Sequence, residues 1–410
     1  MIGAMAFPAR ILATLEAELA QRRPLLAELA ATLAEHPEPP FAEQAASRRL
    51  QAVLAASGFT LEAPLAGLET AFRAELGRGV PALAVFLEYD AHPDGGHLAA
   101  RPLTAAASVV ALTALATVLS VLPGRLVVVG APAAEPAAPN AGGKVLLLER
   151  GALDGIDAAL ILLATNARRP RLTSAPAGRL LELRFSGKAS HAASAPERGV
   201  NALEAALGTF ALLNSLRQHL PPGCRADGVI VHGGAAPNIV PERAVARFWL
   251  RAPGPATLRR LARRLLRAAD GAAMAAGATV EHEDYCRPYP NVLDCPPLGQ
   301  VAAEQWHAVW EVEPEGPSAL PTPTDFGAVS QVVPSLALTL TVAGATLCTP
   351  EFAAAARRPE AQANALRAAR VLARTAATLL LTPERIAAGA RDLAARQERL
   401  RAFAARVGDS

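Results

Sequence analysis

The sequence predicts an α/β protein in which a mixed sheet, covered by helices on both faces, carries an inserted ferredoxin-like α+β domain. Short apolar runs alternate with helical stretches over residues 82–163, the pattern of a doubly covered sheet. From residue 179 the order becomes strand, helix, two strands, helix and strand, which is typical of a small antiparallel domain. We therefore expect a larger α/β domain over 1–177 and 290–410, and an inserted smaller domain over 178–289.

The elements of the larger domain follow from local pattern. We expect helices over residues 1–75, with a proline-rich break at 37–40 and a glycine cap at 58. The next expected elements are strands at 82–90, 125–133 and 157–163, helices at 105–122 and 143–153, and a solvated helix at 384–403. Ligands of such sheets bind in loops at the carboxyl ends of the strands. Those loops span 90–102, 131–143 and 164–170.

Composition excludes several classes of protein. The chain has 410 residues, a formal net charge of +3 and only 4% aromatic residues, so we expect no nucleic-acid partner. The apolar stretch 105–122 contains serine and threonine and precedes a Pro-Gly turn, which indicates a buried helix and no membrane contact. Four cysteines without a CxxC pair, and no apparent signal peptide, predict a cytoplasmic protein.

Lysine is rare in this chain. Only Lys144 and Lys188 occur among 40 basic residues, and both lie in glycine-containing motifs. A glycine turn that opens a helix can bind an anion, but both lysines could equally be structural. The arginine bias indicates a GC-rich genome, for which specialised metabolism is a plausible setting.

Six motifs cover 35–59, 86–97, 187–207, 233–248, 324–335 and 349–352. In order and spacing they resemble the dinuclear-zinc amidohydrolase and aminoacylase branch of the M20 metallopeptidase family, over nearly the whole chain. The resemblance implies a catalytic α/β domain, a lid that forms a homodimer, and hydrolysis of an amide next to a carboxylate. In that chemistry two metal ions activate a water molecule and a carboxylate acts as the base.

The metal motifs of this family are changed here. By resemblance, one ligand cysteine, three ligand histidines and the general base fall on Ala99, Arg101, Leu163, Cys348 and Ala134. Only Glu135 keeps a ligand carboxylate. Zinc needs about three or four converging ligands, so we predict no metal cofactor. Zinc or manganese would bind only if Asp90, His92 and His97 had rebuilt a site with Glu135 and Cys348.

Loss of the metal would leave Glu135 and Asp90 as carboxylates in a cleft without a cation, which is unfavourable. We expect the Arg101 guanidinium to pair with Glu135 or with a substrate carboxylate. The alternative is that Arg101 points to solvent from a loop that has lost its function.

Other candidates follow from the resemblance. His191 matches a lid histidine that reaches the substrate across the dimer, and Asn238 matches a substrate-binding lid residue, although it could be a turn asparagine. Cys348 could be a nucleophile if His97 or His92 lowers its pKa, or an inert cysteine. Further expected substrate-site residues are Asp90, His92 and Asp325, the last as a hydrogen-bonding support.

Two classes of function remain open. One is a metal-independent enzyme for a small acyl-amino-acid or other carboxylate-bearing molecule, acting by condensation, cyclisation, elimination or acyl transfer. His191, Arg101 and Glu135 would position that chemistry, with His97 and Cys348 as further catalytic candidates. The other is a non-catalytic binder or scaffold. The retained lid motifs favour an enzyme and the missing base favours a scaffold; a metal-dependent amide hydrolase ranks third.

Overall fold

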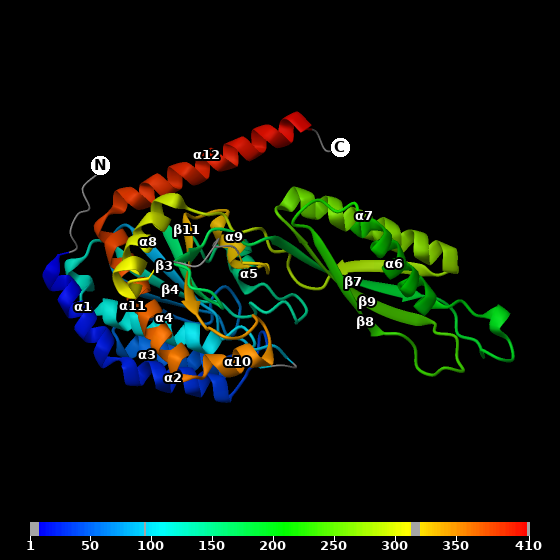
Figure 1. The fold of residues 1–410 in the computed structure, drawn as a ribbon, viewed down its shortest axis with the longest axis horizontal. Coiled ribbons are helices and arrows are strands. Elements are labelled where there is room, and N and C mark those ends of the chain that lie inside the picture. Colours follow the sequence, from blue (N-terminus) through cyan, green and yellow to red (C-terminus); the bar gives the residue numbers. More distant parts are fainter. Residues whose placement is uncertain (1–7, 94–95, 313–319, 408–410) are drawn as a thin grey trace.

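The computed structural model describes residues 8–93, 96–312 and 320–407, with side chains up to 399. The chain forms a larger domain around a seven-stranded sheet and a smaller domain around a four-stranded sheet (Figure 1). The larger sheet has the order β1-β2-β4-β3-β5-β11-β6. Its inner strands β3, β4, β5 and β11 are parallel, whereas β1, β2 and β6 are antiparallel to their neighbours. The fold is thus the mixed, doubly covered sheet that the sequence predicts.

The seven strands are β1 (Thr60–Glu62), β2 (Phe72–Gly77), β3 (Ala82–Leu87), β4 (Arg125–Gly130), β5 (Ala158–Thr165), β6 (Arg171–Leu172) and β11 (Ser335–Thr341). Every residue of β3 and β11 is buried. Continuous apolar runs occur here because helices cover both faces of the sheet.

Most helices cover one face of this sheet: α1 (Ala9–Gln21), α2 (Arg23–Glu35), α3 (Gln44–Ala56), α4 (Arg101–Ala116), α8 (Pro296–Trp310), α10 (Pro350–Ala356) and α11 (Pro359–Leu381). The other face packs against α5 (Gly143–Glu149) and α9 (Phe326–Ser330). Helix α12 (Pro383–Val407) runs along the outside (Figure 1). Helix α4 is buried along almost its whole length, which explains the uncharged stretch at 105–122. Within the described ranges, no helix is long and apolar enough to cross a membrane.

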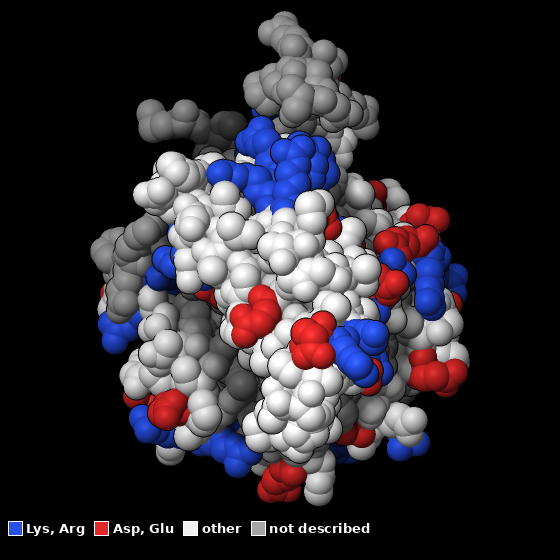
Figure 2. All heavy atoms as spheres, turned by 90° about the vertical axis from the view of Figure 1, so that its right-hand side faces the viewer, with Lys and Arg blue, Asp and Glu red and all other residues white. Residues whose placement is uncertain are grey.

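The smaller domain consists of β7 (Ala177–Ser186), α6 (Ala202–Arg217), β8 (Arg225–His232), β9 (Arg243–Ala252), α7 (Pro255–Ala276) and β10 (Thr279–Asp284). Its antiparallel sheet has the order β10-β7-β9-β8, and both helices pack on one face of it. This is the ferredoxin-like arrangement predicted. Figure 2 views this domain from its free end: the middle of the face is largely uncharged, and basic side chains gather at the top, where α7 lies.

One stretch was predicted wrongly. Residues after Gly58 were expected to be helical up to about residue 75, but the structure forms β1 and β2 there. In β2, buried Phe72 and Ala74 alternate with less buried Arg73 and Glu75. This period of two indicates a strand, but it extends over too few residues to stand out in the sequence.

Candidate functional site

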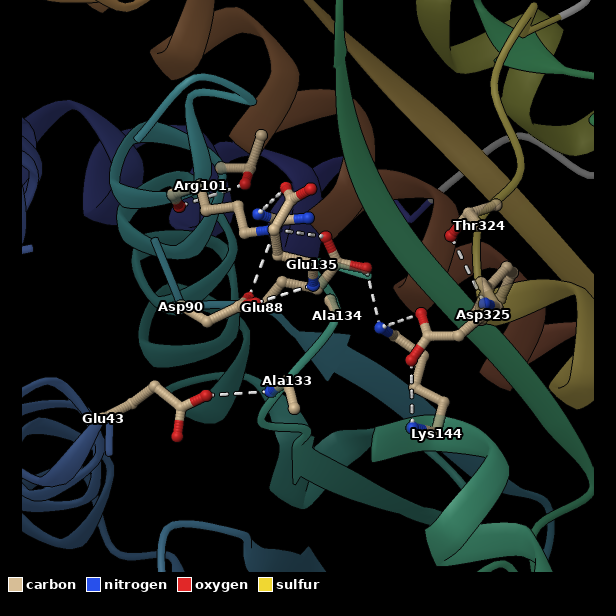
Figure 3. Close-up of polar contacts among 12 residues, drawn as sticks. Glu43, Glu88, Asp90, Arg101, Ala133, Ala134, Glu135, Lys144, Thr324 and Asp325 are labelled. Carbon is tan, nitrogen blue, oxygen red and sulfur yellow. Dashed lines mark hydrogen bonds and ion pairs between the residues drawn. The ribbon is translucent and has the colours of Figure 1, made fainter. Parts of the chain in front are cut away.

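The predicted loops meet at the carboxyl edge of the parallel strands. The connection from β3 to β4 goes to one side of β3, and the connection from β4 to β5 crosses to its other side. A ligand crevice forms where the strand order reverses in this way. Residues 88–90 follow β3, 133–135 follow β4 and Cys348 follows β11. Figure 3 shows the polar contacts made there.

Arg101 is the centre of this cluster. It is the first residue of α4 and follows Ala100, which has a left-handed φ of 55°. Its Nε lies 3.3 Å from a Glu88 oxygen and 3.3 Å from Asp90 Oδ1, and its Nη1 lies 3.1 Å from Glu135 Oε2. Burial alone would lower the pKa of Arg101, but the three carboxylates raise it well above its usual value. The expected pairing with Glu135 is confirmed; the solvent-facing alternative is wrong, because the side chain is only 9% exposed.

Lys144 is a second buried cation beside Arg101. Its Nζ lies 2.7 Å from Glu88 Oε1 and 2.7 Å from Asp325 Oδ1, and its backbone N–H donates to Asp325 Oδ2 at 3.0 Å. Burial alone would raise the pKa of Glu88, but Lys144 and Arg101 bring it below its usual value. Glu88 is therefore an ionised bridge between the two cations.

Two further carboxylates hold the segment after β4. Asp90 Oδ2 accepts the backbone N–H of Glu135 at 2.7 Å, and a Glu43 oxygen accepts that of Ala133 at 2.8 Å (Figure 3). Burial raises the pKa of Asp90 to about 7 and also raises that of Glu43. Ala133 has a φ of 51°, a strained conformation for a residue with a Cβ. These contacts keep Glu135 at the cleft.

The residues present do not fit the metal centre that the resemblance implies. Within the described part of the chain, no group of three histidine, cysteine, aspartate or glutamate side chains is placed to hold a metal ion. The carboxylates that converge here already surround Arg101 and Lys144. Two organic cations therefore offset part of the negative charge of this acidic cluster.

A cavity of about 250 Å³ opens over Arg101. The positions at which the resemblance places ligands and base all line it: Ala99, Arg101, Ala134, Glu135, Leu163 and Cys348. The smaller domain contributes Trp249 and Arg251, so the cleft lies between the two domains. Arg251 Nη1 donates a hydrogen bond to Asp227 Oδ2 at 2.8 Å. The buried Nε of Arg251 has no hydrogen-bond partner among the described residues.

His92 and His97 do not reach this cleft. The His97 ring lies 2.9 Å from the Leu33 carbonyl through Nε2, is 8% exposed, and has a pKa that burial lowers to about 4. The backbone of His92 pairs with that of Gly96, away from the cleft lining. The expected catalytic role of His97, and a site for His92 beside Glu135, have no support in this geometry.

Cys348 does line the cleft, without a histidine among the other lining residues. Desolvation and the Glu135 carboxylate raise the pKa of its thiol. A thiolate nucleophile requires the opposite shift. Asp325 is fully buried and accepts hydrogen bonds from Lys144, and it is not among the residues that line the cavity, so direct contact with a substrate has no support in this geometry.

His191 and Asn238 lie together, far from Arg101 in the same chain. The Ala192 N–H donates to the Asn238 carbonyl at 3.0 Å, and His191 Nδ1 accepts N–H groups of the next turn. Both residues are exposed, beyond the end of the ten-residue strand β7 that starts at the domain junction. Such a strand is about 30 Å long, so these residues could meet a cleft only across a dimer.

Glu43, Glu88, Trp249 and Arg251 were not predicted as residues of the site. The rarity of lysine singled out Lys144, but its pairing with Glu88 and Asp325 was not predicted. For Lys144 the rarity of lysine was a usable signal, because one of the two in the chain is fully buried here. For Glu88 the signal was a charge directly after a wholly apolar strand. Trp249 and Arg251 had none, since their place depends on how the two domains meet.

Known proteins resemble both parts of the chain. Residues 180–274 match the family described as peptidase dimerisation domain. The Xaa-Arg dipeptidase of Mus musculus is 33% identical over 338 residues, covering 78% of this chain and 77% of the relative. One of the subunits of the p-aminobenzoyl-glutamate hydrolase of Escherichia coli is 28% identical over 274 residues, covering 62% of this chain and 56% of the relative. A dinuclear metal-binding peptidase of the M20 family from Bacillus subtilis has a similar fold, with a TM-score of 0.62 and 19% identity over 88% of this chain and 99% of that one.

Proposed function

Because this chain belongs to the M20 family of peptidases and amidohydrolases, we propose that its cleft binds a small molecule carrying an acylated amino group and a carboxylate, without a metal ion. The observation that carries this proposal is the Arg101 guanidinium, which lies within 3.3 Å of three carboxylates. The family resemblance places a metal ligand at Arg101 and another at Glu135. A cation fixed on the protein thus fulfils the electrostatic role of the ion.

The cleft offers groups for metal-independent chemistry. Arg251 attracts a carboxylate, and an arginine N–H can stabilise negative charge that develops on a carbonyl oxygen. Glu135 is 19% exposed at the cleft, whereas Asp90 is fully buried, so Glu135 is better placed to accept a proton. His191 and Asn238 of a partner chain would close over the ligand. Condensation, cyclisation, elimination and acyl transfer are the reactions that such groups could support.

Two other functions have specific support. Amide hydrolysis is favoured by the names of the relatives, a dipeptidase and a hydrolase. Non-catalytic binding is favoured by Ala134, which stands where the family has its base and has no side chain for proton transfer.

Binding calorimetry with a panel of N-acyl amino acids, in the presence of a chelator, tests the proposal. We expect saturable binding that Arg251→Met weakens about tenfold or more, because a charge-assisted contact is lost. Arg251 lies outside the Arg101 cluster, so this variant should fold. Arg259→Met, on an exposed part of α7, should bind like the wild type. Binding or hydrolysis that appears only after zinc is added would contradict the proposal and favour a hydrolase.

A further inference from the structure

A second cavity, larger than the cleft, lies on the opposite side of the segment that carries Arg101. Its volume is about 550 Å³, and its walls come from α2, the start of α4 and α10. Small side chains make up most of these walls, among them Ala30, Ala31, Ala34, Ala353, Ala354 and Ala356. The cavity opens to solvent, since Ala31, Pro37 and Ala354 in its lining are exposed. Helices α2 and α10 both present alanine to this space, whose volume is typical of small-molecule sites.

The cavity and the cleft share two walls. Around the start of α4, His97, Ala100 and Pro102 line the cavity, whereas Ala99, Arg101 and Thr104 line the cleft. Around the start of α10, Leu347 and Cys348 line the cleft, and the residues from Pro350 onward line the cavity. Ala100 and Cys348 have left-handed φ values of 55° and 59°. A molecule in the cavity would thus touch the reverse side of both segments.

The charges around the cavity indicate what the ligand carries. His97 is neutral near pH 7, since burial lowers its pKa to about 4. Arg357 ends α10 at the rim, and its Nη2 donates to the Ala34 carbonyl at 2.9 Å. No acidic side chain of the described residues forms an ion pair with Arg357, and its charge also lowers the pKa of His97 in the cavity wall. Glu35 is the other charged group of the lining and is exposed.

We propose that this cavity is a second small-molecule site, which takes a monocarboxylate with an unbranched apolar chain. The chain lies among the alanines of α2 and α10, and the carboxylate lies against Arg357. A cavity of this size accommodates a chain on the order of eight carbons. Because the walls are shared, binding here steadies the segments that carry Arg101 and Cys348.

Calorimetry on the full chain with hexanoate, octanoate and octylamine tests this site. Octanoate should bind saturably and about tenfold more tightly than hexanoate, since two more methylenes are buried. Ala354→Phe should weaken octanoate binding at least tenfold; Ala354 is exposed at the rim, so the fold should tolerate the ring. Ala363→Phe is the matched control, at an exposed alanine of α11 outside the cavity lining, and should leave the affinity for octanoate unchanged. Arg357→Gln should weaken binding about fivefold or more.

Three results would overturn the proposal. The first is that octanoate shows no saturable binding. The second is that octylamine binds as tightly as octanoate, which would assign the polar end of the ligand to Glu35. The third is that Ala354→Phe and Ala363→Phe change octanoate binding equally. Hydrogen exchange locates the ligand independently. Octanoate should protect backbone amides in 28–36 and 350–357. Protection at 133–136 and 320–324 instead would place the acid in the cleft and contradict a second site.

Discussion

Lys144 forms ion pairs with two buried carboxylates, those of Glu88 and Asp325, and its own side chain is 0% exposed. Removing one partner of a buried ion pair leaves an uncompensated charge, which costs about 3–5 kcal/mol. We expect Lys144→Met to lower the free energy of unfolding by about that amount, measured by denaturant titration. Lys188 is exposed, so the free energy of unfolding of Lys188→Met should stay within about 0.5 kcal/mol of the wild-type value. Similar losses in both variants would show that Lys144 does not neutralise its partners.

Asp90 gives the stability of the protein a pH dependence. Burial raises its pKa from 3.8 to about 7, with Arg101 acting against the rise and Glu43 and Glu88 adding to it. Between these values the folded chain keeps a proton that the unfolded chain has lost, so this group's contribution becomes less favourable as pH rises. From pH 5 to pH 8 the free energy of unfolding of the wild type should therefore fall by about 2–3 kcal/mol relative to that of Asp90→Asn. Unfolding titrations at several pH values measure this; a constant difference would contradict it.

At the scale of elements, the start of α5 places Lys144. A Cβ added to Gly143 would lie 1.9 Å from the Pro132 carbonyl oxygen, so α5 can approach β4 this closely only with glycine at its first position. Gly143→Ala should lower the free energy of unfolding by about 2 kcal/mol or more, because backbone must move. Gly271, inside α7, has no neighbouring atom within 4 Å of such a Cβ. Gly271→Ala should therefore raise stability by about 0.5–1 kcal/mol. Thermal unfolding of both variants checks this contrast, and a stable Gly143→Ala protein would contradict the packing argument.

The sequence predicts the elements that have strong periodicity. Strands β3, β4 and β5 and the complete smaller domain lie where the apolar patterns place them. The ladder β1-β2 was missed because its strands are short. The contacts of the site depend on residues far apart in sequence, as with Lys144 and Asp325, 181 positions apart, so no local pattern contains them. His97 and Arg101 are four positions apart and line different cavities, a distinction set by the turn at Ala100.

At the scale of the whole molecule, the smaller domain exposes apolar side chains suited to self-association. Leu207 and Leu212 on α6 and Val229 and Val231 on the edge strand β8 are 42–56% exposed. We expect a homodimer through this surface, which would also bring His191 towards a partner's cleft. Val231→Arg should yield monomers by light scattering, because a charge is buried without a partner. Val80→Arg, at a 74% exposed valine of the larger domain, should leave the dimer intact. A monomeric wild type would contradict the expectation.

The central claim is that Arg101 stands in place of a metal ion. Elemental analysis of the purified protein, after dialysis against zinc and manganese followed by removal of free ions, tests it most directly. The account predicts much less than one metal ion per chain, because the carboxylates of the site are already paired with Arg101 and Lys144. One or more tightly held ions per chain would contradict it and would make amide hydrolysis the leading function.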